Sequence, residues 1–470
     1  MEYKKLTFFD LTNIVIGSII GADVYVASGL AAGMIGPFAI VCWAVAGIFA
    51  TIIALVFAYC SYFVPRVGGP FAYVSAAFDD FYGFLTGWSI WIAEMLALPV
   101  FAIAFVRYLQ YFTPLDPVRQ IAVQGAFVCT LTAVNVAGVR VAGRVNDVLT
   151  IIKLLPLVML VAAGAVVFAL NPAVLSAHYI PFIPFGLEHF GSALVIIFWA
   201  YAGFELGTLP AEEVENPDAT IPKAIGTGMA IVAIFYLSTN FVVYGSVPSG
   251  DLAASPIPLV LAASVLLGSA GALIVSIGAL VSVSGSNESN TLGTARLSFA
   301  MAAEGLFPKI FARIHPEYGT PYAALAIQGI IAFTLSAISE IPRLISFAVF
   351  SLSFAYLLTC LALLVLAGDQ DRKLRGQTAL PVAGIAVCLY LLVSTPLFDL
   401  LSGAAVILAG IPLYVYFSPK TDIRHVKDLI VSEEAIVMRR LEQKNLFLAR
   451  FVQLLHAAYF EARRILRRPL

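Results

Sequence analysis

Among the ionisable side chains that lie within the long apolar segments of this 470-residue sequence, five stand out. Isolated burial of a charge is so costly that ionisable residues inside membrane segments are rare and usually functional. A buried carboxylate attracts an ammonium group or holds a proton, and a buried lysine can gain and lose one. The five side chains therefore indicate a protein that binds and moves small charged species. They are Asp23, Glu94, Lys153, Glu205 and Glu288.

The composition identifies the surroundings that must position these charges. Hydrophobic residues make up 61% of the chain, charged residues make up 12%, and the formal net charge is −1. Soluble domains carry about 25% charged residues, and disordered or nucleic-acid-binding chains need more polarity or a basic excess. The apolar runs are long enough for spans of about 20 residues. Because only helices satisfy their own backbone on such runs in lipid, we expect an all-α polytopic membrane protein.

The apolar runs predict 12 transmembrane helices. Their edges are placed to within a few residues. The predicted spans are 9–32, 37–63, 82–112, 120–138, 146–169, 191–209, 224–247, 269–299, 321–340, 343–367, 379–397 and 399–417.

The loops between these spans alternate in positive charge. One set of loops is rich in Lys and Arg, and the opposite set holds almost only Arg119 and Arg343. Because positively charged loops stay in the cytoplasm, we expect a multi-pass protein of the cell membrane with both termini in the cytoplasm. The positive set comprises Lys4, Lys5, Arg66, Arg140, Arg144, Lys223, Lys309, Arg313, Arg372, Lys373 and Arg375.

Charge also divides the chain into two regions. Residues 420–470 hold 17 of the 55 Lys, Arg, Asp and Glu residues. We therefore expect a transmembrane domain over 1–419 and a cytoplasmic tail over 420–470. The tail mixes apolar and charged residues at helical spacing and ends on R-R-I-L-R-R-P-L, which predicts a basic amphipathic segment. Either the tail lies on the anionic inner face of the bilayer, or it is a solvated helix without a partner.

Two spans carry glycines next to a carboxylate. The first span reads G-S-I-I-G-A-D from Gly17 to Asp23, and the sixth carries Gly203 just before Glu205. These spans are five apart and so begin on opposite faces of the membrane. Glycine-interrupted spans at matching positions of two halves indicate an inverted repeat with broken helices and a binding site at the membrane midplane. The simpler alternative is that the glycines only allow close helix packing.

Four stretches resemble the amino acid–polyamine–organocation family of transporters. The resemblance implies a LeuT-type fold with a 5+5 inverted repeat over about 9–169 and 191–367, helices 1 and 6 broken, and two peripheral helices over 379–417. It also implies secondary transport of amino acids or related amines, with no cofactor and no covalent chemistry. The stretches are G-S-I-I-G (17–21), F-V-P-R-V-G-G-P-F-A-Y-V (63–74), F-W-A-Y-A-G-F-E through I-P-K-A-I (198–225), and A-R-L-S-F-A-M-A-A-E-G-L-F-P-K through G-T-P (295–321).

The resemblance also implies a substrate site at the two breaks. Family members bind the substrate carboxylate at amides just after the glycine of span 1, and its ammonium at carbonyls before that glycine and in span 6. This use of half-helix ends follows from their partial charges. Trp199 resembles the family's aromatic gate, although simple packing would also explain it. The implied substrate residues are Ile19, Gly21, Ala22, Asp23, Phe198, Trp199, Ala200, Tyr201 and Ala202.

Asp23 departs from the family pattern, which usually has a small residue at that position. It could simply cap the outer half of the first span. Alternatively its carboxylate occupies the place of the substrate's carboxylate, repelling a second anion and attracting an ammonium. Glu94, in the middle of span 3, strengthens the second interpretation, unless it has a partner on a neighbouring helix or holds a proton. Under that interpretation the substrate is a basic amino acid, a polyamine or another amine.

Lys153 in span 5 is the second important charge. By resemblance, a lysine here replaces the sodium ion of sodium-coupled relatives and implies coupling to protons. We expect carbonyls near Gly17 and the hydroxyls of Ser282 or Ser284 beside it. The alternative is that its side chain extends to the cytoplasmic interface.

Two further carboxylates have a structural or gating role by resemblance. Glu205 would bond backbone or hydroxyl groups that the sixth span exposes, and Glu213 belongs to an acidic motif of a cytoplasmic loop. The sequence assigns no partner to Glu288.

Other function classes fit the sequence less well. A channel would need a repeated pore motif or rings of like charge. An enzyme would need clustered His or Cys ligands or a nucleophile with its base, and the five cysteines lie at no metal-ligand spacing. We expect no nucleic-acid partner and no obligate protein partner, only a small amine substrate, the proton and the bilayer. An exchanger without proton coupling and a non-transporting nutrient sensor remain open.

Overall fold

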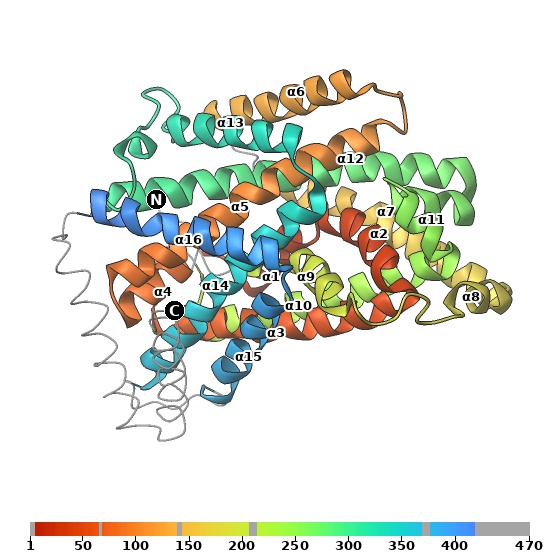
Figure 1. The fold of residues 1–470 in the computed structure, drawn as a ribbon, viewed down its shortest axis with the longest axis horizontal. Helices are drawn as coiled ribbons and strands as arrows, with labels where there is room; N and C mark the ends of the chain where they lie inside the picture. Colours follow the sequence, from red (N-terminus) through yellow and green to blue (C-terminus); the bar gives the residue numbers. More distant parts are fainter. Residues whose placement is uncertain (1–4, 65–67, 139–142, 206–213, 369–376, 419–470) are drawn as a thin grey trace, which may run out of the picture.

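The protein is a bundle of α-helices, as the computed structural model of residues 5–64, 68–138, 143–205, 214–368 and 377–418 shows (Figure 1). In these ranges the only strand-like pairing is an isolated bridge between Leu6 and Val214. Within the same residues, seven helical segments are long and apolar enough to cross a membrane, and four shorter helices are also apolar. The expected all-α polytopic class is therefore confirmed. The tail over 420–470 and the loop residue Glu213 lie outside the described residues.

A helix lies in each of the predicted span ranges. The helices in these ranges are α1 (Phe8–Ile19), α2 (Asp23–Ile35), α3 (Ala39–Phe63), α5 (Asp80–Leu109), α6 (Pro117–Val136), α7 (Gly143–Leu170), α9 (Phe190–Ala200), α10 (Pro217–Ser246), α12 (Pro258–Ala303), α13 (Tyr322–Ile338), α14 (Ile341–Gly368), α15 (Ala379–Ser394) and α16 (Leu397–Phe417). Short helices and turns connect them: η1 (Gly36–Phe38), α4 (Pro70–Ala77), α8 (Pro172–Tyr179), α11 (Ser249–Ala254) and η4 (Lys309–Ala312).

Helix α12 begins earlier than the sequence predicts. The apolar run places the start of the span at residue 269, whereas the helix begins at Pro258. Gly268 has a positive φ of 66° and interrupts the helical backbone at the predicted boundary. The assigned helix therefore consists of a short segment before Gly268 and a long one after it.

Helix α5 runs through the centre of the bundle and packs against α14 and α12. Figure 1 shows α6 and α13 together along one side, and α13 also contacts α5. Helices α3 and α10 pack against each other, and α1 packs on α10. The broken first span is thus held between α10 and α12, both of which carry polar side chains toward it.

The first span is interrupted at residues 20–22. Helix α1 ends at Ile19, Ile20 is extended with ψ 99°, and α2 begins at Asp23. Such a break leaves backbone groups without helical partners, which in apolar surroundings must be satisfied by side chains or ligand. Tyr236 of α10 meets part of this need, because its hydroxyl donates a hydrogen bond of 2.9 Å to the Ile19 carbonyl.

Aromatic residues around this break form a connected buried cluster. The Tyr236 ring lies 5.3 Å from that of Trp43 and 5.1 Å from that of Tyr201. The Tyr201 hydroxyl donates to the Trp43 carbonyl at 3.0 Å, and the Trp43 indole donates to the Tyr244 hydroxyl at 2.9 Å. Tyr244 in turn donates to the Ser28 carbonyl at 3.2 Å. The cluster therefore ties α2, α3 and α10 to the end of α9.

Removing the Tyr236 hydroxyl should destabilise the fold measurably. In Tyr236→Phe the Ile19 carbonyl stays buried and loses its partner, a cost of about 1–3 kcal/mol. Thermal unfolding of the purified protein should show a clear drop in Tm. Tyr416→Phe is the matched control, since Tyr416 is 81% exposed whereas Tyr236 is 0% exposed. Equal Tm values for both variants would contradict this account of the break.

Candidate functional site

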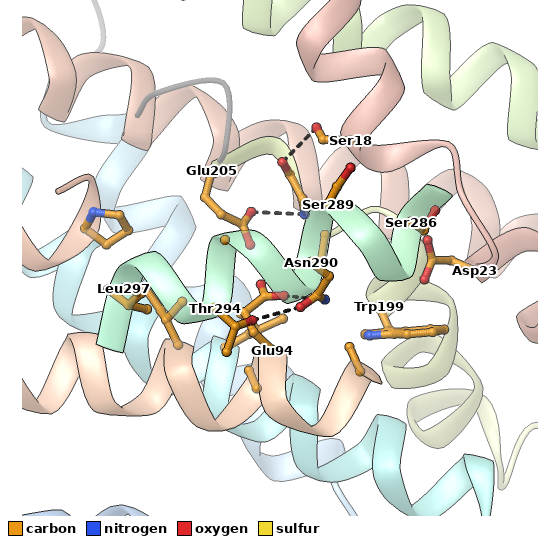
Figure 2. Close-up of a pocket in the computed structure, with 18 of the residues that line it drawn as sticks. Ser18, Asp23, Glu94, Trp199, Glu205, Ser286, Ser289, Asn290, Thr294 and Leu297 are labelled. Carbon is orange, nitrogen blue, oxygen red and sulfur yellow. Dashed lines mark hydrogen bonds between the residues drawn. The ribbon is translucent and has the colours of Figure 1, made fainter. Parts of the chain in front are cut away.

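A cavity of about 130 Å³ lies beside the break in the first span. It is bounded by α1, α2, α4, α5 and α12, by Trp199 of α9 and Leu352 of α14, and by the turn that follows α9. Figure 2 shows Trp199 and Asp23 at one end of this cavity and Leu297 at the other. The cavity therefore runs along α12 from the break toward the C-terminal part of that helix.

Three carboxylates from three separate segments line the cavity. Asp23 opens α2, Glu94 lies in the middle of α5, and Glu205 follows α9 (Figure 2). None of the described residues that line it is Lys, Arg or His. A cleft lined by one sign of charge within low-dielectric walls concentrates ions of the opposite sign. The described lining therefore carries acidic side chains and no basic one.

Glu94 is positioned by α12. The Asn290 side-chain amide donates to the Glu94 carboxylate at 2.7 Å, and the Thr294 hydroxyl donates to the Asn290 side-chain oxygen at 2.9 Å. The second bond orients the amide so that its NH2 group faces Glu94 (Figure 2). The partner on a neighbouring helix that the sequence left open is therefore Asn290. It is a neutral partner, so it orients the carboxylate without cancelling its charge.

Asn290 and Thr294 were not predicted. The available signal is the run S-G-S-N-E-S-N-T over 284–291, which is unusually polar for an apolar helix. Polar side chains buried in such a helix are hydrogen-bonded, either within their own helix or to a neighbouring one. The sequence could not show which of these polar residues faces α5.

Asp23 lies at the start of α2, although the N-cap of this helix is Ala22. It is the first residue of α2, where a negative charge is favoured by the helix dipole. Its carboxylate also lines the cavity and lies beside Ser286 (Figure 2). A side chain at Gly21 would collide with Ser286 and would come within 3.2 Å of the Asp23 carboxylate. Glycine at position 21 therefore lets α12 and Asp23 approach the break.

The structure divides the predicted substrate residues into two groups. Asp23, Glu94, Trp199 and Ala202 line the cavity, and the Trp199 ring lies 5.9 Å from that of Phe101. The remainder are buried near the break or at the end of α9 but do not line the cavity. The Tyr201 hydroxyl, for example, donates to the Trp43 carbonyl. This second group comprises Ile19, Gly21, Ala22, Phe198, Ala200 and Tyr201.

Gly203 and Glu205 shape the turn that follows α9. The Gly203 amide donates to the Glu205 carboxylate at 3.0 Å, and the Ser18 hydroxyl donates to the Gly203 carbonyl at 3.0 Å. Gly203 has a φ of 111°, and a Cβ there would lie 2.8 Å from the Ser18 carbonyl oxygen. Only glycine fits both the backbone conformation and this approach to α1. Glu205 thus accepts a hydrogen bond from the backbone of this turn, and its structural or gating role stays a prediction.

Lys153 of α7 is buried, with 6% of its surface exposed, and it does not line the cavity. The end of its side chain rests on Gly285 of α12, where a Cβ would lie 2.7 Å from Cε and 3.0 Å from Nζ. Gly285 was not among the predicted neighbours. Of those neighbours, Ser284 donates to the Leu280 carbonyl of its own helix, and Ser282 is fully buried. Gly17, the remaining predicted neighbour, lines the cavity.

Comparison with known proteins gives one family. The family model described as "Amino acid permease" matches residues 6–416. The chain is 28% identical to the branched-chain amino acid permease BcaP of Bacillus subtilis (strain 168), over 89% of this chain and 93% of that protein. It is 25% identical to the methylthioribose transporter of the same strain, over 89% and 94%. It is 29% identical to an uncharacterized transporter of Mycobacterium tuberculosis (strain ATCC 25618 / H37Rv), over 87% and 90%.

A methyl group at Gly203 should weaken the contact between α1 and the turn after α9. Gly203→Ala combines an unfavourable backbone conformation with a collision against Ser18, and we expect a loss of about 2–4 kcal/mol in stability. Gly186→Ala is the matched control, because Gly186 also has a positive φ (73°) but nothing lies within 4 Å of its Cβ position. Thermal unfolding of both variants measures the difference. A Gly186→Ala variant as unstable as Gly203→Ala would show that backbone strain alone is responsible.

Proposed function

The chain belongs to the amino acid permease family, and from that membership we propose that it is a secondary transporter of amino acids or related amines that works by alternating access. The family makes it a membrane transporter rather than an enzyme. The observation that supports binding of an amine is the cavity with its three carboxylates and no basic lining residue. Transport needs no cofactor in this proposal, because the only events are binding, proton transfer and movement of helices.

The proposed fold is of LeuT type with 12 transmembrane helices. The helices found in each predicted span range and the break between α1 and α2 support this fold. We further propose that residues 1–419 form the transport domain of a protein in the cell membrane with both termini in the cytoplasm, and that 420–470 form a cytoplasmic tail. The alternating charge of the loops supports this orientation.

The cavity fits a state that faces the cytoplasm. Besides the break, its lining includes Gly68, Pro70 and Leu297. These residues follow the C-terminal end of α3 or lie in the last turns of α12, which the proposed orientation places at the cytoplasmic side. Trp199 and Phe101 pack together at the opposite end of the cavity. They are thus placed to separate a bound substrate from the outside.

The substrate that we propose carries a positive charge. The N-terminus of α2, which would bind a substrate carboxylate, already has the Asp23 carboxylate on its first residue. Glu94 offers a second carboxylate across the cavity, held by Asn290. A cation would gain charge-assisted hydrogen bonds from both, whereas a second anion would be repelled. The named relatives act on branched-chain amino acids and methylthioribose, so this part of the proposal rests on residues of this chain.

A second candidate is an exchanger of amino acids or amines without proton coupling, and a third is a nutrient sensor that binds without transporting. Both would use the same cavity. The exchanger is favoured if flux needs substrate on both sides of the membrane. The sensor is favoured if binding occurs without flux.

Counterflow in proteoliposomes tests the charge of the substrate. We expect putrescine or L-arginine to compete with a labelled amine, and L-leucine to compete weakly. Asp23→Asn should lower the affinity for the cation by about tenfold or more, because one charged partner becomes neutral. Glu317→Asn is the control variant, because Glu317 is an exposed carboxylate that is not among the residues lining the cavity. Competition by neutral zwitterions together with none by either cation would overturn the cationic assignment.

Lys153→Ala tests proton coupling. We expect this variant to lose accumulation driven by a proton gradient and to keep exchange of internal for external substrate, because the cavity itself is unchanged. Lys309→Ala, at an exposed lysine of η4, is the matched control and should keep both activities. Undiminished accumulation by Lys153→Ala under a proton gradient would refute the assignment.

A further inference from the structure

Glu288 lies on the face of α12 that touches Lys153. The lysine ammonium rests on Gly285, and Glu288 is three residues further along the same helix. Residues three apart on a helix are neighbours on its surface, with Cβ atoms about 5–6 Å apart. Glu288 is therefore positioned beside the end of the Lys153 side chain. Unlike Asp23, it is not among the residues that line the cavity.

Lys153 interacts electrostatically with two carboxylates that lie on different helices. Glu288 of α12 and Asp23 of α2 both attract its ammonium. Asp23 also interacts electrostatically with Tyr236 of α10 and Glu94 of α5. Glu288 likewise interacts with Arg296 of its own helix. Lys153 is therefore attracted both by a carboxylate that lines the cavity and by one that does not.

A bound cation creates a conflict at Asp23. If a substrate ammonium pairs with Asp23, the charged Lys153 loses much of one partner and gains a positive neighbour. Like charges in such a low-dielectric interior repel each other much more strongly than in water. Without a second partner, the lysine would have to release its proton or the substrate would have to leave.

We propose that Glu288 is a second counter-ion of Lys153, which holds the ammonium while a cationic substrate occupies Asp23. Glu288 then allows the proton on Lys153 and the substrate to be bound at the same time, which is the requirement for symport. Without Glu288 their binding becomes mutually exclusive, as in an exchanger of protons for cations. This inference rests on the proposed function, because it presupposes a cationic substrate and proton transfer at Lys153.

Gly285 is part of the same arrangement. Any side chain there would occupy the place of Cε and Nζ of Lys153. Ser286, the next residue, contacts Gly21 beside Asp23. The segment from Gly285 to Glu288 therefore brings the lysine, its second carboxylate and the substrate-side carboxylate together.

A double-mutant cycle without ligand tests whether the two residues are partners. Wild type, Lys153→Gln, Glu288→Gln and the double variant are compared by thermal unfolding of the full chain at about pH 6. Glu288→Gln should lower Tm when Lys153 is present and have little effect in Lys153→Gln. Glu288→Asp should restore most of the loss. An equal drop in both backgrounds would show a structural role of Glu288 that is independent of Lys153, and would overturn the pairing.

Binding of putrescine and L-arginine to the same proteins tests the consequence. For Glu288→Gln we expect affinity for the cation to fall by about tenfold at about pH 6. The loss should shrink at a pH at which Lys153 has given up its proton, because Asp23 then has no lysine ammonium to pair with. The same substitution in Lys153→Gln should leave the pH profile of that background unchanged, which separates Lys153 from titration of the carboxylates. Glu317→Gln serves as the control.

The outcomes separate this inference from the proposed function. If wild type binds a cation and Glu288→Gln has the same pH profile as wild type, the counter-ion role is wrong and the cationic transporter stands. If wild type binds neither cation while it binds L-leucine, the cationic site is wrong, and simultaneous occupancy falls with it. In that case the cycle in thermal unfolding still decides whether Glu288 pairs with Lys153.

Discussion

The structure depends on how the backbone N–H and C=O groups at a helix break inside an apolar bundle find hydrogen-bond partners. Backbone groups that lose their helical partners cannot turn to water at this depth, so other parts of the chain must bond them. Tyr236 bonds the Ile19 carbonyl, and Ser18 bonds the Gly203 carbonyl of the turn after α9. The break in the first span and the turn after α9 therefore touch, and the first bonds a carbonyl of the second. Asp23 at the break and Glu205 in the turn line the cavity.

The break also determines where ionisable side chains can be buried. Asp23 is tolerated at this depth as the first residue of α2, where the helix dipole favours it. Glu94 has no such helix end and needs the side chains of Asn290 and Thr294 instead. Lys153 rests on a glycine of α12 and is attracted by two carboxylates. Each buried charge thus has a distinct local reason to be there, and all of these contacts border α12 or the break.

The sequence predicted the elements of the fold better than the contacts at the site. Apolar runs and glycine patterns predicted the span ranges and the interruption near Gly21, because these features follow from local composition. The charged residues Asp23, Glu94 and Glu205 were also predicted, since their presence in apolar runs is itself unusual. Asn290, Thr294 and Gly285 were missed, because a polar residue or a glycine in a helix does not reveal which neighbour it faces. For the same reason the sequence assigned no partner to Glu288, because its proximity to Lys153 depends on the packing of α7 against α12.

Helix α12 carries Gly285, Ser286, Glu288, Asn290 and Thr294 within fewer than three turns. Successive residues of an α-helix are rotated by about 100° around its axis. A single-residue insertion or deletion between Gly285 and Asn290 would therefore turn Asn290 away from Glu94 while Lys153 kept its place on Gly285. The length of this segment is consequently as constrained as its composition. Over evolutionary time we would expect this part of the chain to accept substitutions but not changes in register, in contrast to the loops between the helices.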